Sequence, residues 1–238
     1  MVKRPLADLT LLALLSFLLV GVLAAVFGDT VLLPFGSYVP TESTMGIVQR
    51  IFYFHLPAAL TSFLAFFVAF VASLGYLARR RLVWDRVASA SVEIGVLFCT
   101  MVLVTGPLWA RPVWGAWWPW EPRLTTTLLL WLLYLSYLLL RGFTESREQR
   151  ARFSAVLGVL AFLDVPVVYF SVRWWRGVHP VVFGPGGGGI EPRMRHVLFV
   201  ATLAFALLYV ILLAMRVRLA ALEDDVTALR AGAAEAAA

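Results

Sequence analysis

The chain has 238 residues, of which 61% are hydrophobic and 14% are charged, and its mean hydropathy is +0.86. This composition is more apolar than that of a water-soluble globular domain and indicates that most of the chain lies in lipid. The net charge of +6 requires no nucleic-acid partner, because cations that flank the apolar segments account for most of it.

Six apolar runs predict an all-α, polytopic membrane protein. A helix needs roughly 20 apolar residues to cross the bilayer core, and runs of about this length lie at 9–27, 57–78, 87–109, 124–140, 153–172 and 195–216. A spanning β-barrel would need strands that alternate apolar and polar residues, whereas residues 128–140 are apolar on every side. We therefore predict a six-helix transmembrane domain at 1–216 and a cytoplasmic C-terminal tail at 217–238.

The first run and the single cysteine each bear on one alternative. The run at 9–27 follows Lys3 and Arg4, as a secretory signal would, but it is long for one and lacks a clear cleavage site. We interpret it as a retained helix. Cys99 is the only cysteine, so the chain has no internal disulfide and no C-x-x-C-H motif for covalent haem attachment.

The distribution of cations predicts the orientation in the membrane. With six spans, both termini and the loops at 79–86 and 141–152 share one side. That side carries thirteen cations: Lys3, Arg4, Arg79, Arg80, Arg81, Arg86, Arg141, Arg147, Arg150, Arg152, Arg216, Arg218 and Arg230. The other side carries seven: Arg50, Arg111, Arg123, Arg173, Arg176, Arg193 and Arg195. Because cytoplasmic loops are richer in Lys and Arg, we predict that both termini are cytoplasmic, with the remaining loops on the outer face of the cell inner membrane.

The outer loops contain an unusual concentration of tryptophan. Five of the nine tryptophans are Trp109, Trp114, Trp117, Trp118 and Trp120. Interruptions at Pro112, Gly115, Pro119 and Pro122 predict that no long regular helix runs through this segment. An interfacial aromatic belt would place aromatic residues at both ends of most spans, but the predicted cytoplasmic side has only Trp84 nearby. The asymmetry favours a binding surface for a large, flat, apolar ligand.

Two histidines on the same predicted face make haem the leading hypothesis for that ligand. A proximal histidine with a second axial donor is a common way to hold haem iron. His55 lies at the start of the second span, beside Pro57, and His179 lies in the third outer loop, so together they flank the tryptophans in sequence. Either one alone is more typical of an ordinary hydrogen-bonding residue. His196 is a weaker alternative, because it closely follows the glycine-rich run at 184–189.

Arginines beside these residues are candidate partners for the haem propionates, because guanidinium groups pair with carboxylates in bidentate fashion. The candidates are Arg111, Arg123, Arg173 and Arg176. Anchoring at the membrane interface explains any one of them equally well.

Three stretches resemble a known family. The segment 114–125, Trp-Gly-Ala-Trp-Trp-Pro-Trp-Glu-Pro-Arg-Leu-Thr, resembles the tryptophan-rich signature of the haem-handling membrane proteins of cytochrome c biogenesis. Its Arg-Leu-Thr ending is more similar to the haem exporter protein C (CcmC) branch than to the cytochrome c synthase branches. Residues 51–59 resemble the family's first histidine region, and residues 165–179 resemble its second.

The resemblance implies a specific function. His55 and His179 would be the axial ligands of a b-type haem, with Trp114, Trp117, Trp118 and Trp120 as its platform. The tryptophan-rich loop would also receive a periplasmic haem chaperone, CcmE, onto which the family loads haem covalently. The implied partners are the ABC transporter subunits CcmA and CcmB and the small single-span protein CcmD.

This chain departs from the family signature at Glu121, where the family has Asp. The carboxylate is retained but lies one methylene further from the backbone, so a hydrogen bond to loop backbone stays within reach. The glycine-rich run at 184–189 is typical of a flexible tether that lets His179 move.

Other features leave alternatives open. An electron-transfer subunit with permanent haem would place histidines within its spans, and a transporter subunit would show broken helices and repeats; Pro107 and Pro166 keep the second alternative open.

We interpret Glu93 and Asp164, inside predicted spans, as packing residues first and proton carriers second. The heptad spacing of Leu219, Leu222, Val226 and Leu229 predicts an amphipathic helix for a partner.

Overall fold

A computed structural model describes residues 40–41, 43–180, 182 and 190–236. Its elements are a 3-10 helix, η1 (Gly46–Ile51), and the α-helices α2 (Phe52–Arg79), α3 (Leu82–Trp114), α4 (Pro122–Phe143), α5 (Arg147–Phe162), α6 (Asp164–Trp175) and α7 (Pro192–Ala236). The predicted all-α fold is confirmed for this part of the chain. The first predicted span, 9–27, and the glycine-rich run lie outside the described residues.

Among the described residues, five helical segments are long and apolar enough to cross a membrane: η1 with α2, α3, α4, α5 with α6, and the greater part of α7. Each contains one of the predicted spans that begin at 57, 87, 124, 153 and 195. The remaining predicted span, 9–27, and the cytoplasmic placement of the termini stay predictions.

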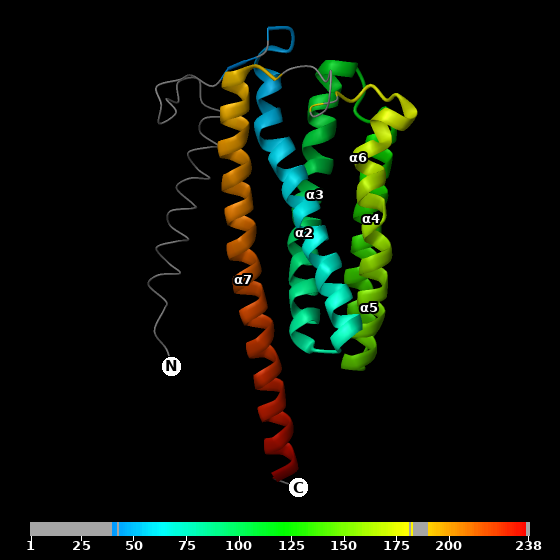
Figure 1. Cartoon of the computed structure of the whole chain (residues 1–238), viewed down its shortest axis with the longest axis vertical. Coiled ribbons are helices and arrows are strands. Elements are labelled where there is room, and N and C mark those ends of the chain that lie inside the picture. Colours follow the sequence, from blue (N-terminus) through cyan, green and yellow to red (C-terminus); the bar gives the residue numbers. More distant parts are fainter. Residues whose placement is uncertain (1–39, 42, 181, 183–189, 237–238) are drawn as a thin grey trace.

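The helices α2 and α3 form the centre of the bundle. Both contact α7 on one side, and α4, α5 and α6 lie on the other (Figure 1). Only Arg80 and Arg81 separate α2 from α3, and the turn is possible because Arg80 adopts a left-handed conformation with φ 52°. Its amide donates to the Tyr76 carbonyl at 2.8 Å, which closes the end of α2.

A small residue allows α2 and α3 to approach closely. A Cβ atom at Gly95 would lie 2.6 Å from Cε1 of Phe66. Phe66 in turn stacks on Tyr134 of α4, with ring centroids 3.8 Å apart. Because lipid is as apolar as these side chains, tight van der Waals packing rather than hydrophobic burial holds such helices together.

The structure confirms that no regular helix runs through the whole tryptophan-rich segment, but the helix before it extends beyond the predicted span 87–109. Helix α3 runs through Pro107 and Pro112 and ends only at Trp114, where Gly115 is left-handed with φ 75°. Pro112 lies in the last turn, so it removes one backbone hydrogen bond close to a helix end that has unpaired carbonyls in any case. The irregular loop is therefore residues 115–121.

A break at Leu163 divides the fourth described span, Arg147–Trp175, into α5 and α6. Asp164 is the first residue of α6 and Pro166 its third, which is a tolerated position because first-turn amides have no partner within the helix. Asp164 is buried, as expected of a packing residue.

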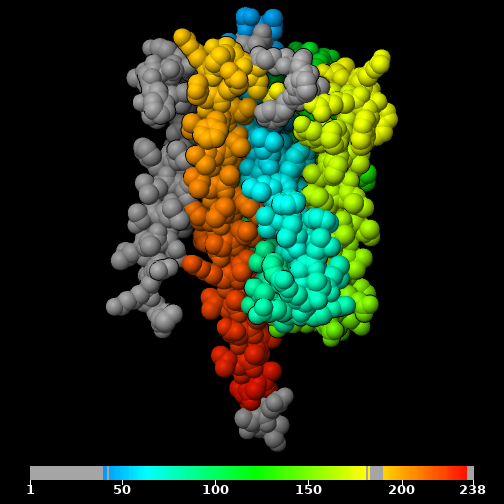
Figure 2. Space-filling view, viewed as in Figure 1, coloured from blue at the N-terminus to red at the C-terminus, as the bar shows by residue number. Residues whose placement is uncertain are grey.

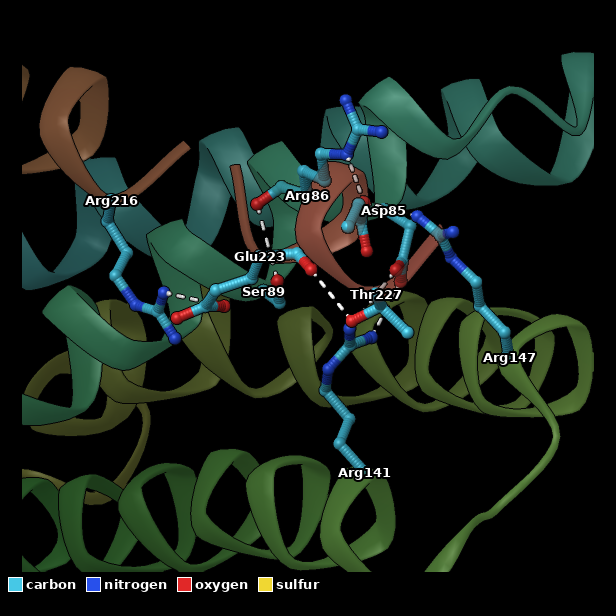
Figure 3. A network of polar contacts seen from close by, with 9 residues as sticks. Asp85, Arg86, Ser89, Arg141, Arg147, Arg216, Glu223 and Thr227 are labelled. Atoms are coloured by element: carbon cyan, nitrogen blue, oxygen red, sulfur yellow. Dashed lines mark hydrogen bonds and ion pairs between the residues drawn. The ribbon is translucent and has the colours of Figure 1, made fainter. Parts of the chain in front are cut away.

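The end of the bundle where α2 and α4 stop and α3 and α5 start is here named the arginine-rich end. Two of its carboxylates, those of Asp85 and Asp224, are paired with arginines from other helices (Figure 3). Asp85 of α3 accepts two hydrogen bonds from Arg141 of α4, at 2.6 and 3.1 Å. Asp224 of α7 accepts from Arg86 at 2.7 Å and also pairs with Arg147.

Helix α7 crosses the bundle and extends beyond the other helices at this end (Figures 1 and 2). Within the bundle Arg216 pairs with Glu93 of α3, at 2.5 and 3.2 Å, so Glu93 has a structural role. The tail predicted from residue 217 is the continuation of α7 as far as Ala236. Its heptad residues are exposed by 46–74%, and the partner expected for them stays a prediction.

Candidate functional site

A cavity of about 330 Å³ opens at the opposite end of the bundle, here named the cavity end, where α3 and α6 stop and α2 and α4 start. This volume is within the usual range for small-molecule sites, roughly 300–1,000 Å³. Most of its lining is apolar and comes from four helices. Its chemically distinctive members are His55, Trp109, Trp114, Trp118, Arg123, Tyr169, Arg173 and His179.

His55 reaches the cavity from the first turn of α2 and is buried. Its Nδ1 lies 2.8 Å from Oγ1 of Thr105 on α3. A Cβ atom at Gly106 would lie 3.6 Å from Cε1 of the ring, and Trp109 meets the ring edge-on at 5.9 Å between centroids. Helix α3 therefore fixes the orientation of this imidazole.

His179 reaches the cavity from the segment that follows α6, three residues after a left-handed Arg176 ends the helix. Its ring meets Trp114 edge-on, with centroids 6.1 Å apart. Nδ1 lies 3.3 Å from Nη1 of Arg123 and 3.3 Å from the Pro180 carbonyl oxygen. Burial, and then the positive charge of Arg123, lowers the pKa of His179 to about 3. The imidazole is therefore neutral at physiological pH and has a lone pair to offer.

Two of the four candidate arginines line the cavity. Arg123, in the first turn of α4, donates from Nη2 to the Tyr169 carbonyl at 2.9 Å, while its buried Nε has no hydrogen-bond partner among the described residues. Arg173 of α6 lies over the ring of Tyr169 at 5.6 Å. Arg111 donates to the Gly115 carbonyl and, like Arg176, is not part of the lining.

Only two of the four tryptophans predicted to bind haem line the cavity. Trp114 and Trp118 line the cavity, whereas Trp117 and Trp120 are 57% and 69% exposed. Gly115 and Trp120, which flank Trp117 and Trp118 in the loop, both have positive φ, at 75° and 52°. The Nε1 atom of Trp118 is buried and lacks an acceptor within the described part of the chain.

Glu121 does not line the cavity but caps α4. Its Oε1 accepts from the Leu124 amide at 2.9 Å, its backbone carbonyl accepts from the Thr125 amide, and Pro122 occupies the first helical position. Burial raises the pKa of this carboxyl, although bonds from the backbone amides of Leu124 and Arg123 oppose the change. The longer side chain thus reaches the backbone of the first turn of α4 rather than that of the loop.

Three residues that bear on the site were not identified from the sequence: Trp109 and Tyr169, which line the cavity, and Thr105, which contacts His55 from α3. Thr105 lies in the middle of an apolar run with no motif around it, and only the packing of α3 on α2 brings it to His55. Trp109 belonged to the tryptophan cluster, and this membership was the available signal. His196 is exposed at the start of α7 and does not line the cavity.

The lining has the chemistry that haem requires. Two imidazoles face one aromatic space, and they suit an iron whose other four positions are filled by a porphyrin. The unpaired Nε of Arg123 and Nε1 of Trp118 are donors that suit carboxylates. Among the described residues, no cluster of three or more His, Cys, Asp or Glu is arranged to hold a bare metal ion.

Comparison with known proteins assigns the family. The family model described as Heme exporter protein C matches residues 5–232. The chain belongs to this family. The predicted resemblance to the haem exporter protein C family is thereby confirmed.

Individual members of the haem exporter protein C family agree over most of their length. The Heme exporter protein C of Bradyrhizobium diazoefficiens is 35% identical over 82% of this chain and 75% of its own. The protein of that name from Paracoccus denitrificans is 32% identical over 78% of both chains. That of Escherichia coli K12 is 32% identical over 76% of this chain and 74% of its own.

Proposed function

We propose that this chain binds haem at the cavity end and delivers it to a periplasmic haem chaperone, CcmE, during cytochrome c maturation. The observation that carries the proposal is that His55 and His179, 124 residues apart in sequence, line the same aromatic cavity. The name Heme exporter protein C, shared by the relatives, supports the same reading.

Each part of the lining has a role in holding the cargo. His55 and His179 bind the iron of a b-type haem from its two axial sides, and Trp114 and Trp118 cover the porphyrin by edge and face contacts. Arg123 and Arg173 pair with the propionates. Arg111 and Arg176 stay predicted propionate partners at greater distance from the cavity. Haem itself supplies the four equatorial nitrogens, so two protein ligands complete the iron coordination.

The acceptor docks on aromatic residues outside the cavity. Trp117 and Trp120 are more than half exposed, and so are Trp174 and Trp175 at the end of α6. Exposed tryptophans are strong anchors in protein interfaces. The predicted platform thus has an inner pair, Trp114 and Trp118, that contacts haem and an outer pair, Trp117 and Trp120, that contacts CcmE. Glu121, which follows Trp120, caps α4.

The arginine-rich end faces the cytoplasm under this proposal, because cations concentrate on the cytoplasmic side of membrane proteins. The cavity then opens at the periplasmic surface of the inner membrane. The proposed partners within the membrane are CcmA, CcmB and CcmD.

The test uses purified full-length protein and haem absorbance. The double variant His55→Ala, His179→Ala is expected to lose the low-spin spectrum of a bis-histidine haem, whereas His196→Ala, the matched control outside the cavity, keeps it. Full haem absorbance in the double variant rejects the site. A redox titration and an assay of transfer to the soluble acceptor then separate delivery from electron transfer, since an electron-transfer subunit cycles its haem without losing it.

A further inference from the structure

The hydrogen-bond partners of the two candidate axial ligands, His55 and His179, favour different imidazole tautomers. Thr105 has one hydroxyl proton, and its Oγ1 lies 2.7 Å from the Met101 carbonyl, the ordinary acceptor for a threonine in a helix. The hydroxyl therefore accepts, rather than donates, at its 2.8 Å contact with Nδ1 of His55. His55 carries its proton on Nδ1, and its Nε2 lone pair is available for iron.

His179 has the opposite arrangement. The guanidinium of Arg123 is always charged and can only donate. At its 3.3 Å contact with Nη1 of Arg123, Nδ1 of His179 must therefore be the acceptor. A neutral imidazole that accepts at Nδ1 carries its proton on Nε2, and a protonated Nε2 has no lone pair for a metal.

A second contact of the same nitrogen defines the alternative state. The Pro180 carbonyl oxygen also lies 3.3 Å from Nδ1, and a carbonyl can only accept. Donation to Pro180 requires the proton on Nδ1, which leaves Nε2 free. The contacts with Arg123 and Pro180 thus favour two different tautomers, of which only the second binds iron through Nε2.

We propose that Arg123 couples recognition of the cargo's carboxylates to ligation by His179, so that His55 is the resident ligand and His179 the conditional one. This inference rests on the proposed haem site. A carboxylate is a stronger partner for a guanidinium than a neutral imidazole is. A propionate that engages Arg123 therefore releases Nδ1 of His179.

The proton balance of this change is zero. As Arg123 turns to the carboxylate, His179 loses its proton from Nε2 and gains one at Nδ1, with solvent as carrier at this half-buried position. Nδ1–H then donates to the Pro180 carbonyl, and the Nε2 lone pair forms the bond to iron. The reverse sequence provides a route for release, because loss of the carboxylate contact returns Arg123 to His179 while His55 keeps its own hydrogen bond.

The experiment compares haem with its dimethyl ester, in which neutral methyl ester groups replace both carboxylates. Wild-type protein is expected to give a six-coordinate, low-spin spectrum with haem and a five-coordinate, high-spin spectrum with the ester. Arg123→Met removes the donors and keeps an unbranched side chain of similar length, so it is expected to give low-spin spectra with both. Arg193→Met, an exposed arginine outside the cavity, is the matched control and is expected to behave as wild type.

The outcomes separate the two levels of the argument. A low-spin, six-coordinate ester complex in wild-type protein overturns the coupling, and this comparison needs no variant that might fold poorly. So does a high-spin ester complex in a folded Arg123→Met protein. If wild-type protein with haem shows no histidine-dependent low-spin spectrum, the proposed haem site itself is wrong.

Discussion

The two ends of the helical bundle treat charge differently. At the arginine-rich end, Asp85, Glu93 and Asp224 each pair with an arginine from another helix. At the cavity end, Arg123 and Arg173 line a cavity whose described lining contains no Asp or Glu. The donors Nε of Arg123 and Nε1 of Trp118 have no acceptor among the described residues, although both are buried.

This difference separates structural from functional use of the same residue types. Burying a polar group without a partner costs free energy. The ion pairs at the arginine-rich end therefore stabilise the folded bundle, because each charge in these pairs has a partner. Unpaired donors beside an apolar cavity instead suit a ligand that brings its own acceptors. Substitutions at the two ends should therefore affect different measurements: stability at the first, and haem binding at the second.

The largest effect is expected from Asp85→Asn at the arginine-rich end. The substitution removes the charge that Arg141 needs in a mostly buried position. Loss of one partner of a buried pair costs roughly 3–5 kcal/mol of unfolding free energy. Denaturation of the purified protein in detergent measures the loss, and Asp225→Asn, an exposed aspartate on the protruding part of α7, is the control. Unchanged stability would show that this ion pair does not hold the bundle together.

At the cavity end, Thr105→Val should weaken haem binding with little loss of stability. The variant keeps the shape of the side chain but removes the acceptor for Nδ1 of His55. Residues that orient a metal ligand in this way are worth about 10–100-fold in metal affinity. Haem titration measures the change, and Thr202→Val in α7 is the control, because among the described residues its hydroxyl bonds only the Leu198 carbonyl of its own helix. Equal affinities for the two variants would remove Thr105 from the site.

The division of the tryptophan-rich loop predicts a smaller difference. Trp118→Phe should weaken haem binding, because Trp118 lines the cavity, whereas Trp117→Phe should leave it unchanged. Aromatic contacts contribute about 0.5–1.5 kcal/mol beyond the buried area, so we expect the haem dissociation constant to rise by roughly twofold to tenfold. Binding of CcmE should show the reverse order of sensitivity. The same ranking in both assays would contradict an inner and an outer face.

The smallest effect is expected from Asp224→Asn. This carboxylate pairs with Arg86 and Arg147 at the protein surface. Exposed ion pairs contribute about 0–1 kcal/mol, and this one lies at the end of the bundle opposite the cavity. Haem affinity should therefore be unchanged and the stability nearly so. A loss of haem binding would show that the two ends are coupled.

Particular residues show how much of the site could be predicted from the sequence. The order of the predicted spans placed His55, the tryptophan-rich loop and His179 at one end of the bundle, and the cavity lining agrees. The capping role of Glu121 was within reach of the sequence, because an acidic residue followed by Pro122 is typical of a helix start. The path of α3 through Pro112 was not, since a proline close to a helix end costs one hydrogen bond and neighbouring contacts decide whether the helix continues.

The sequence by itself determined that the chain is all-helical and membrane-embedded, because hydrophobic runs of spanning length leave a backbone in lipid few other options. It also determined which residues share an end of the bundle. Only the tertiary structure decided that Trp114 and Trp118 line the cavity while Trp117 and Trp120 are exposed, since this depends on how the loop packs against the helices that form the cavity. Likewise, the pairing of His55 with Thr105 and of His179 with Arg123 depends on contacts between helices distant in sequence, which no local pattern encodes.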